Sequence, residues 1–329
     1  MLRSETAAQP ERMKRALEGL RRYQDAERTP PPPPMPVVAR QNGARLRDYG
    51  GDGPAVLFVP SLINPPSVLD LSADRSLLRW LAGRGRRVLL LDWGWPDEAR
   101  RGLSVGAHVE RILLPLIDGL GEKPALVGYC LGGTMALAAA QLAEVRAVAT
   151  IAAPWRFAGF PDEARASLAQ LWAQSQPALG ALGVLPMEVL QSAFWSLDPA
   201  RTVAKFEAYS KAEGEKARDF VMLEDWANDG PPLAGAAARE LFEDLFAADL
   251  PGHGLWRVGG ATIEPAALPC PVLNIVSTSD RIVPAATAAP AGERLDLALG
   301  HVGMVVGGRA RGALWEPLAR WLSGAGPSC

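Results

Sequence analysis

Residues 124–142 read PALVGYCLGGTMALAAAQL, and this stretch decides the fold of the chain. Its first part is short and apolar, as in a buried strand, and its last part is rich in the alanine and leucine that favour a helix. Between them, Gly128, Cys130 and Gly132 form the cysteine version of the sharp strand-to-helix turn that presents a nucleophile. Glycine lets neighbouring backbone approach this turn closely, and the amino end of the helix favours a thiolate. The pattern alone fits either a nucleophilic Cys130 or a buried structural cysteine on a turn that contains glycine.

The composition of the 329 residues excludes several functional classes. The 34 basic and 36 acidic side chains leave a net charge of −2, so nothing in the charge indicates nucleic-acid binding. The cysteines, Cys130, Cys270 and Cys329, have neither the number nor the spacing of a disulfide framework or a metal site. Residues 1–28 are too highly charged for a secretory signal, and no uncharged apolar run reaches the roughly 18 residues that span a bilayer. We therefore expect a cytoplasmic protein without a metal site or a transmembrane segment.

The amino-terminal residues 1–36 look separate from the rest of the chain. A helix is predicted from Pro10 to about Arg28, with an apolar face that carries Met13, Leu17, Leu20 and Gln24. The proline run that follows ends this helix and favours an extended polyproline segment. We expect an arm that either docks on the body of the protein or binds a partner or a lipid surface.

The following residues alternate between strands and helices, which predicts an α/β fold. Apolar strands are expected at residues 55–59, 88–92, 126–129 and 147–151, with helices at residues 75–84 and 104–120. Continuous apolar strands separated by helices indicate a mostly parallel sheet with helices on both faces. Residues 37–153 therefore form the first part of the predicted core.

The alternation stops near residue 154 and resumes near residue 269. Residues 154–268 read as mainly helical, without regular strands, and contain Trp155, Trp172, Trp195 and Trp226. Strands return at residues 272–276 and 295–298, and a last helix is expected at residues 309–322. We predict that residues 154–268 are a helical cap inserted before the strand that carries Asp280. This cap should cover Cys130 and leave only a narrow path to its thiol, because ligands bind at the carboxyl ends of such strands. Residues 269–323 then complete the core, and residues 324–329 form a tail.

Two polar residues that follow the late strands complete a candidate triad with Cys130. Asp280 comes after the strand at 272–276, and His301 comes after the strand at 295–298. The order nucleophile, acid, histidine is the one that this type of fold uses. The other histidines are less suitable, since His108 falls inside a helix and His253 in a loop. We therefore predict that Cys130, Asp280 and His301 are the catalytic residues.

Two backbone N–H groups are candidate donors to an oxyanion. The first is that of Leu131, which follows the nucleophile, and the second should come from the loop at residues 60–66. In this loop we choose Leu62, and the alternative is that the loop only positions the helix after it.

These motifs together resemble the polyhydroxyalkanoate synthases, and most of all the catalytic subunit of the two-component (class III) enzymes. The stretches that carry the resemblance, in order, are LFVPSLINPPSVLDL, LLLDWGWPDEA, GYCLGGTMA, LEDWANDGPPLAG, PCPVLNIVSTSDRIVP and GHVGMVVGGRA. They extend over roughly residues 37–322. The chain departs from the family at Arg281, where a histidine is common, and it lacks the large amino-terminal domain of the single-chain enzymes. Its elbow, with Tyr129 and Thr134, is more similar to that of the single-chain enzymes.

The resemblance implies an α/β-hydrolase fold with a cap and a Cys-His-Asp site that polymerises 3-hydroxyacyl-CoA. Cys130 would carry the acyl group, His301 would be the base and Asp280 the acid. Trp226 and Asp229 match a cap motif that we interpret as structural, and Trp93 follows its strand as in the family. No cofactor is implied, because the CoA thioester is a substrate. The implied partners are a polyester granule surface and either a second synthase subunit or a second copy of the chain.

The chemistry of the residues leaves a second activity open. A thiolate exchanges with a CoA thioester at little cost, and a histidine can then activate either a hydroxyl group or water. Attack by a hydroxyl group extends a polyester, whereas attack by water makes the protein an esterase, thioesterase or polyester depolymerase. A catalytically silent granule protein that keeps the fold is the third alternative.

Overall fold

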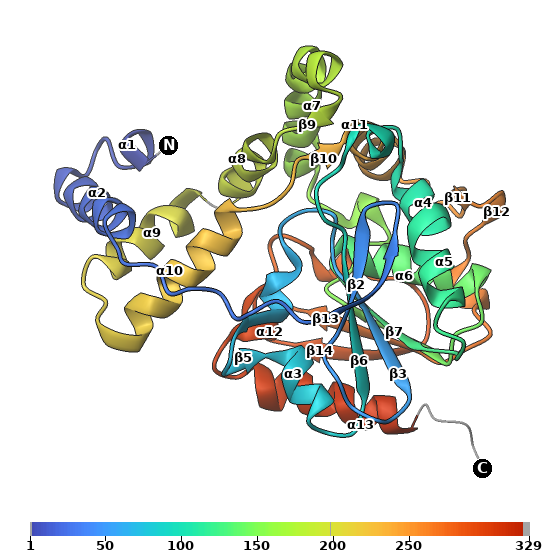
Figure 1. Cartoon of the computed structure of the whole chain (residues 1–329). Coiled ribbons are helices and arrows are strands. Elements are labelled where there is room, and N and C mark those ends of the chain that lie inside the picture. The colour runs from blue at the N-terminus through green and yellow to red at the C-terminus, as the bar shows by residue number, and fades with distance from the viewer. Residues whose placement is uncertain (1, 198, 325–329) are drawn as a thin grey trace.

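The computed structural model describes residues 2–197 and 199–324, and its centre is an eight-stranded sheet (Figure 1). The strand order is β1-β2-β6-β3-β7-β8-β13-β14, in which β1, β2 and β6 pair antiparallel and the remaining pairs are parallel. The strands are β1 Val37–Gln41, β2 Ala44–Asp48, β3 Ala55–Val59, β6 Arg87–Asp92, β7 Ala125–Tyr129, β8 Ala147–Ile151, β13 Val272–Ser277 and β14 Glu293–Leu297. The predicted α/β fold with a mostly parallel sheet is confirmed.

The sheet is buried between two layers of helices, because its central strands are apolar on both faces. One face is covered by α4 Val105–His108, the π-helix Val109–Leu113, α5 Leu114–Asp118 and α6 Leu131–Leu142. The other face is covered by α3 Leu77–Ala82, α12 Gly303–Val306, the π-helix Arg311–Trp315 and α13 Glu316–Gly324. The two hydrophobic cores therefore lie on opposite sides of one sheet.

The structure corrects several of the predicted elements. The helix predicted at residues 75–84 begins only at Leu77, because the hydroxyl oxygen of Ser76 accepts the N–H of Arg79 and caps it. The helices predicted at residues 104–120 and 309–322 are each interrupted by a π-helical segment. The hairpin β1–β2 precedes β3 in the chain. The loop that carries Leu62 therefore follows the third strand along the chain and not the first.

Residues 154–268 are mainly helical, as their sequence predicts. Their helices are α7 Asp162–Leu182, α8 Met187–Leu197, α9 Pro199–Tyr209, α10 Gly214–Asn228, α11 Gly235–Arg239 and the π-helix Glu240–Ala247. The expected absence of strands is wrong, because β9 Val184–Leu185 pairs with β10 Leu233–Ala234, and β11 Arg257–Val258 pairs with β12 Ala261–Thr262. Figure 1 shows α7, α8 and α11 at one end of the sheet, whereas α9 and α10 project to its side.

The tryptophans of this segment differ in their surroundings. Trp155 packs on Trp256, and Trp172 stacks on Phe242 in a different place. Trp195 is 40% exposed. Trp155 and Trp172 therefore pack in separate aromatic pairs, whereas Trp195 is largely at the surface.

The amino-terminal arm packs on the projecting helices α9 and α10 and not on the sheet. It contains α1 Leu2–Glu5 and α2 Pro10–Gln24, so α2 ends four residues before the predicted Arg28. Its buried face is centred on Ala16 and Gly19, beside the predicted apolar face, because Gly19 lies directly on the backbone of Phe206.

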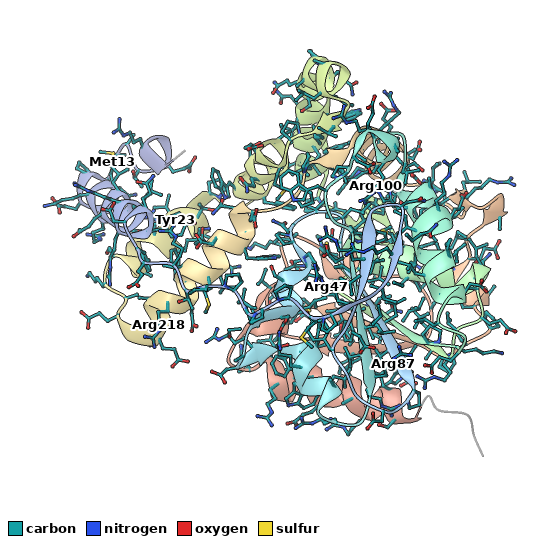
Figure 2. All side chains as sticks on the ribbon, viewed as in Figure 1. Met13, Tyr23, Arg47, Arg87, Arg100 and Arg218 are labelled. Carbon is teal, nitrogen blue, oxygen red and sulfur yellow. The ribbon has the colours of Figure 1, made fainter. Side chains whose placement is uncertain are left out.

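Polar contacts hold the arm in place. Arg12 and Arg15 form ion pairs with Glu207 at 2.7 and 3.2 Å, and the hydroxyl group of Tyr23 donates to Asp225 at 2.6 Å. Figure 2 shows Tyr23 where α2 meets the projecting helices. The arm is thus docked on part of the predicted cap.

The proline segment then leads back to the sheet, where the guanidinium of Arg47 donates to the carbonyl of Met35 at 3.1 Å. The predicted tail at residues 324–329 lies, beyond Gly324, outside the described residues. Among the described helices, none combines the length and the apolar character needed to cross a membrane.

Deletion of residues 1–30 is expected to leave the sheet and its covering helices folded, since the polar contacts that hold the arm in place are with α9 and α10. It should loosen these two helices, because Phe206 and Phe220 lose the ring of Tyr23 that packs on both. Hydrogen exchange should become faster in α9 and α10 and stay slow in the sheet. Loss of cooperative unfolding in the truncated protein would contradict this expectation.

Candidate active site

Cys130 lies at the sharp turn between β7 and α6, where the sequence predicts it. Its backbone has φ 54° and ψ −132°, a strained conformation for a residue with a side chain. The turn is held because the N–H of Cys130 donates to Ile151 O at 2.9 Å and its carbonyl accepts the N–H of Gly133 at 2.8 Å. The thiol therefore projects at the amino end of α6, whose dipole favours a negative charge there.

The glycines of this turn are required by close contacts. A Cβ atom on Gly132 would overlap the carbonyl oxygens of Val59 and Pro60, and one on Gly128 would overlap the backbone of Gly133. The strand, the turn and the loop after β3 can therefore approach one another only without these side chains.

Substitution of Gly132 by alanine is expected to destabilise the protein by about 3 kcal/mol or more, since backbone has to move to make room. Gly180→Ala is the matched control, because Gly180 lies in α7 with no atom near its would-be Cβ. This variant should gain about 0.5–1 kcal/mol from helix propensity. Denaturant unfolding measures both changes in the free energy of unfolding. An equal change for the two variants would contradict the close backbone contact at Gly132.

Asp280 and His301 meet beside Cys130. The ring Nδ1 of His301 lies 2.6 Å from Oδ2 of Asp280, and the imidazole also interacts electrostatically with Cys130. The other oxygen of Asp280 accepts the backbone N–H groups of Ile282 and Val283 at 2.7 and 3.1 Å. The structure thus brings the three predicted residues together in the order thiol, imidazole, carboxylate.

The charge of His301 is set by its two neighbours. Burial alone would lower the pKa of His301, but the charges of Asp280 and Cys130 outweigh it and raise this pKa from 6.5 to about 10. The site therefore favours a protonated imidazole beside the carboxyl group of Asp280.

This shift predicts a pH dependence of stability. A raised pKa of His301 stabilises the folded state fully below its unfolded value of 6.5, and the stabilisation is lost as the pH rises to about 10. The free energy of unfolding should therefore differ most between the parent and His301→Gln below pH 6.5, and the difference should shrink toward pH 10. His253→Gln, at an exposed turn, is the control and should show no such trend. A constant difference for His301→Gln would contradict the ion pair.

Tyr129 is a site residue that the motif search does not assign. Its ring centroid lies 5.1 Å from that of His301, and its hydroxyl group donates to the carbonyl of His301 at 3.4 Å. Burial raises the pKa of Tyr129 well above its ordinary value, so the phenol stays neutral. The ring therefore supports the imidazole without changing the charge of the site.

The loop after β3 presents candidate oxyanion donors. The backbone N–H groups of Leu131 and Leu62 have no hydrogen-bond acceptor within residues 2–197 and 199–324, whereas that of Ile63 donates to the hydroxyl oxygen of Ser61 at 3.0 Å. Ile63, Cys130 and Leu131 line the same chamber. The N–H groups of Leu131 and Leu62 are therefore the candidate donors at the elbow and at this loop.

Tryptophan side chains hold this loop in position. The indole N–H of Trp93 donates to Pro60 O at 3.0 Å, and that of Trp226 donates to Pro65 O at 2.8 Å. The amide of Asn64 donates to Ala227 O at 3.2 Å. The sequence marks Trp93 and Trp226 only through family motifs, and nothing in it marks Asn64.

A small apolar chamber of about 80 Å³ contains the thiol. Most of its walls come from residues 154–268, and the remainder comes from the elbow, from Ile63 and from the loop after Asp280. The lining aromatic side chains are Phe157, Phe160, Phe194, Phe242 and Phe246. Sequence patterns did not identify these residues, because an aromatic side chain in a helix is equally typical of a core.

The other histidines do not join the site. His108 is buried in α4, its Nδ1 lies 2.7 Å from Ser104 O, and burial lowers its pKa to about 4. It packs edge-to-face on Trp93 and so has a structural role. His253 lies at an exposed turn.

Comparisons with known proteins identify the family of the chain. A family model of the alpha/beta hydrolase fold matches residues 54–302. The poly(3-hydroxyalkanoate) polymerase subunit PhaC of Allochromatium vinosum is 30% identical, over 82% of this chain and 80% of its own length. The PhaC subunit of Haloferax mediterranei is 28% identical over 88% of this chain, which spans only 64% of that relative.

Solved structures show the same fold. An esterase from Thermogutta terrifontis superimposes with a TM-score of 0.56 and 18% identity, over 91% of this chain and 99% of that chain. The non-heme bromoperoxidase BpoC of Mycobacterium tuberculosis, described as putative, superimposes with a TM-score of 0.54 and 17% identity, over 88% of this chain and 98% of that chain. At such identities the likeness concerns the fold alone.

Proposed function

Since the chain belongs to the poly(3-hydroxyalkanoate) polymerase family of the α/β-hydrolase superfamily, we propose that it polymerises 3-hydroxyacyl-CoA and releases CoA. The observation that carries this proposal is the 2.6 Å contact of His301 with Asp280 together with the electrostatic interaction of His301 with Cys130, which lines an apolar chamber. A thiol nucleophile suits a thioester substrate, because loading replaces one thioester by another.

In the loading step, the sulfur of Cys130 attacks the thioester carbonyl, and the backbone N–H groups of Leu131 and Leu62 stabilise the oxyanion. The bond from the carbonyl carbon to the sulfur of CoA then breaks. The imidazolium of His301 supplies the proton that the leaving CoA thiolate takes up. The products are an acyl-enzyme thioester and free CoA, and His301 is left neutral.

In the elongation step, neutral His301 takes the proton of a 3-hydroxyl group, whose oxygen attacks the acyl thioester of Cys130. An ester bond forms, and the thiolate of Cys130 is released beside the newly protonated imidazole. Asp280 holds the imidazole so that its Nε2 faces the reacting atoms. The protein thus returns to the charge state in which loading begins.

Exclusion of water decides between polymerisation and hydrolysis in this mechanism. We propose that residues 154–268 act as a cap, because their apolar side chains form most of the chamber above Cys130. An ester-forming hydroxyl group then competes with little water for the acyl thioester.

The size of the chamber favours a short acyl group. Its volume of about 80 Å³ is roughly half of the 150 Å³ cavity that accommodates benzene in another protein. A four-carbon hydroxyacyl group is therefore the substrate that we propose, with its methyl end toward the aromatic wall.

Incubation of the purified protein with 3-hydroxybutyryl-CoA and, separately, with 3-hydroxyoctanoyl-CoA tests the proposal. Free CoA, insoluble polymer and soluble hydroxy acid are measured together. We expect polymer, formed faster from the shorter substrate. Release of soluble acid alone would identify a hydrolase, and the absence of both products would contradict an activity of the chain by itself. A second synthase subunit is then the first addition to test.

A further inference from the structure

A second cavity of about 620 Å³ opens beside the chamber that holds the thiol. It lies between the start of α7, the helix α8 and the loop that follows β13. Phe160, Leu168 and Ala193 line both cavities, so these three side chains are the wall between the open cleft and the chamber. A substrate that reaches Cys130 through this wall would leave its non-acyl part in the cleft.

One face of α7 borders the cleft with neutral polar groups. Ser167, Gln170 and Gln174 lie on this face at helical spacing and are exposed to solvent. The two glutamines are four residues apart, which places their backbone positions about 6 Å from each other along the helix axis. Each carboxamide can both donate and accept a hydrogen bond.

The charges of the cleft do not suit a phosphate group. Glu163, Asp280 and Arg281 are its charged lining residues, and they carry two negative charges and one positive charge. The part of acyl-CoA next to the sulfur is different, because the pantetheine arm is uncharged and carries two amide groups joined by a β-alanine unit. The spacing of these amides is comparable with that of the two glutamines.

We propose that this cleft binds the pantetheine arm of acyl-CoA, and that Gln170 and Gln174 are the binding residues that recognise its amides. The nucleotide then remains outside the cleft, in solvent. The cleft borders α7 from Pro161 to Gln174, or about 20 Å at the rise of an α-helix, which is long enough for the extended arm. This inference rests on the proposed use of a CoA thioester.

The test compares the parent with the double variant Gln170→Leu and Gln174→Leu. Three thioesters of 3-hydroxybutyrate are used: CoA, pantetheine without the nucleotide, and butanethiol without either amide. Release of thiol gives kcat/KM for each. Loss of two hydrogen bonds of about 1 kcal/mol each predicts that kcat/KM falls roughly 30-fold for the CoA and pantetheine thioesters, mostly because KM rises. The butanethiol thioester should be unaffected.

The matched control is Gln24→Leu, which replaces an exposed helical glutamine of α2 far from the cleft and should change none of the three values. An equal fall in kcat/KM for all three thioesters would overturn the inference, because it would indicate a disturbed cap. A fall in kcat/KM for the CoA thioester alone would also overturn the inference, because the two glutamines would then recognise the nucleotide. Failure of the proposed function is distinguishable, since the parent itself would then release no thiol from any of the three, or would release it together with soluble hydroxy acid and without polymer.

Discussion

Substitution of Cys130 by alanine is expected to abolish acyl loading completely. The residue lies alone at the strained turn, and the cavity that contains it is otherwise lined by apolar groups. Neither His301 nor Asp280 can replace the thiol, since the first has to take up and release protons and the second is held by the N–H groups of Ile282 and Val283. No covalent acyl-enzyme should therefore form, and no CoA should be released above the background rate.

Mass spectrometry of the protein after incubation with 3-hydroxybutyryl-CoA measures the loading directly. Cys270→Ala is the matched control, because Cys270 is also half-buried but lies outside the chamber, and this variant should load as the parent does. Near-parental unfolding of Cys130→Ala establishes that the fold is kept. Acylation of the Cys130→Ala protein at another residue would show that the elbow does not carry the nucleophile.

Substitution of Asp280 by asparagine is expected to separate loading from elongation. Loading should survive at a reduced rate, because a thiol is a good nucleophile and the amino end of α6 still favours its thiolate. Elongation should fall by up to about 10⁴-fold, as in other sites whose triad aspartate is neutralised. The step suffers because the hydroxyl group has a pKa far above neutral and needs a well-oriented base.

The geometry around Asp280 gives the reason for so large an effect. Two backbone N–H groups donate to Oδ1, so the oxygen of an introduced asparagine should stay on that side. Its NH₂ group then faces Nδ1 of His301 and forces this nitrogen to accept a hydrogen bond. The neutral imidazole must carry its proton on Nε2, where it can no longer receive one from the hydroxyl group.

Rapid-quench measurement of CoA release tests this division. The Asp280→Asn protein should release about one CoA per active site and then become nearly silent, as an acyl-enzyme accumulates. Asp118→Asn is the control, because Asp118 is an exposed aspartate at the end of α5 that lines neither the chamber nor the cleft. Equal slowing of the burst and of the steady phase in Asp280→Asn would mean that Asp280 serves both steps alike.

Local patterns were sufficient for the core of the fold. The apolar runs that became β3, β7, β8 and β13 are continuous because these strands are buried on both faces, so neighbouring residues alone identify them. The outer hairpin β1–β2 was missed, since its strands alternate between buried and exposed positions and carry arginine. The π-helical segments were also missed, because their interruption of a helix has no local signal in composition.

Sequence patterns were sufficient to place Cys130, Asp280 and His301 directly after three strands of one sheet. Parallel strands end at the same edge, so residues far apart in the chain were expected to meet there, and in the structure they do. Only the tertiary structure decided what surrounds them. The partner of the amino-terminal arm, the aromatic wall of the chamber and the polar face of the cleft each depend on contacts between helices. Such contacts depend on how whole helices are placed, and an amphipathic face does not specify which partner covers it.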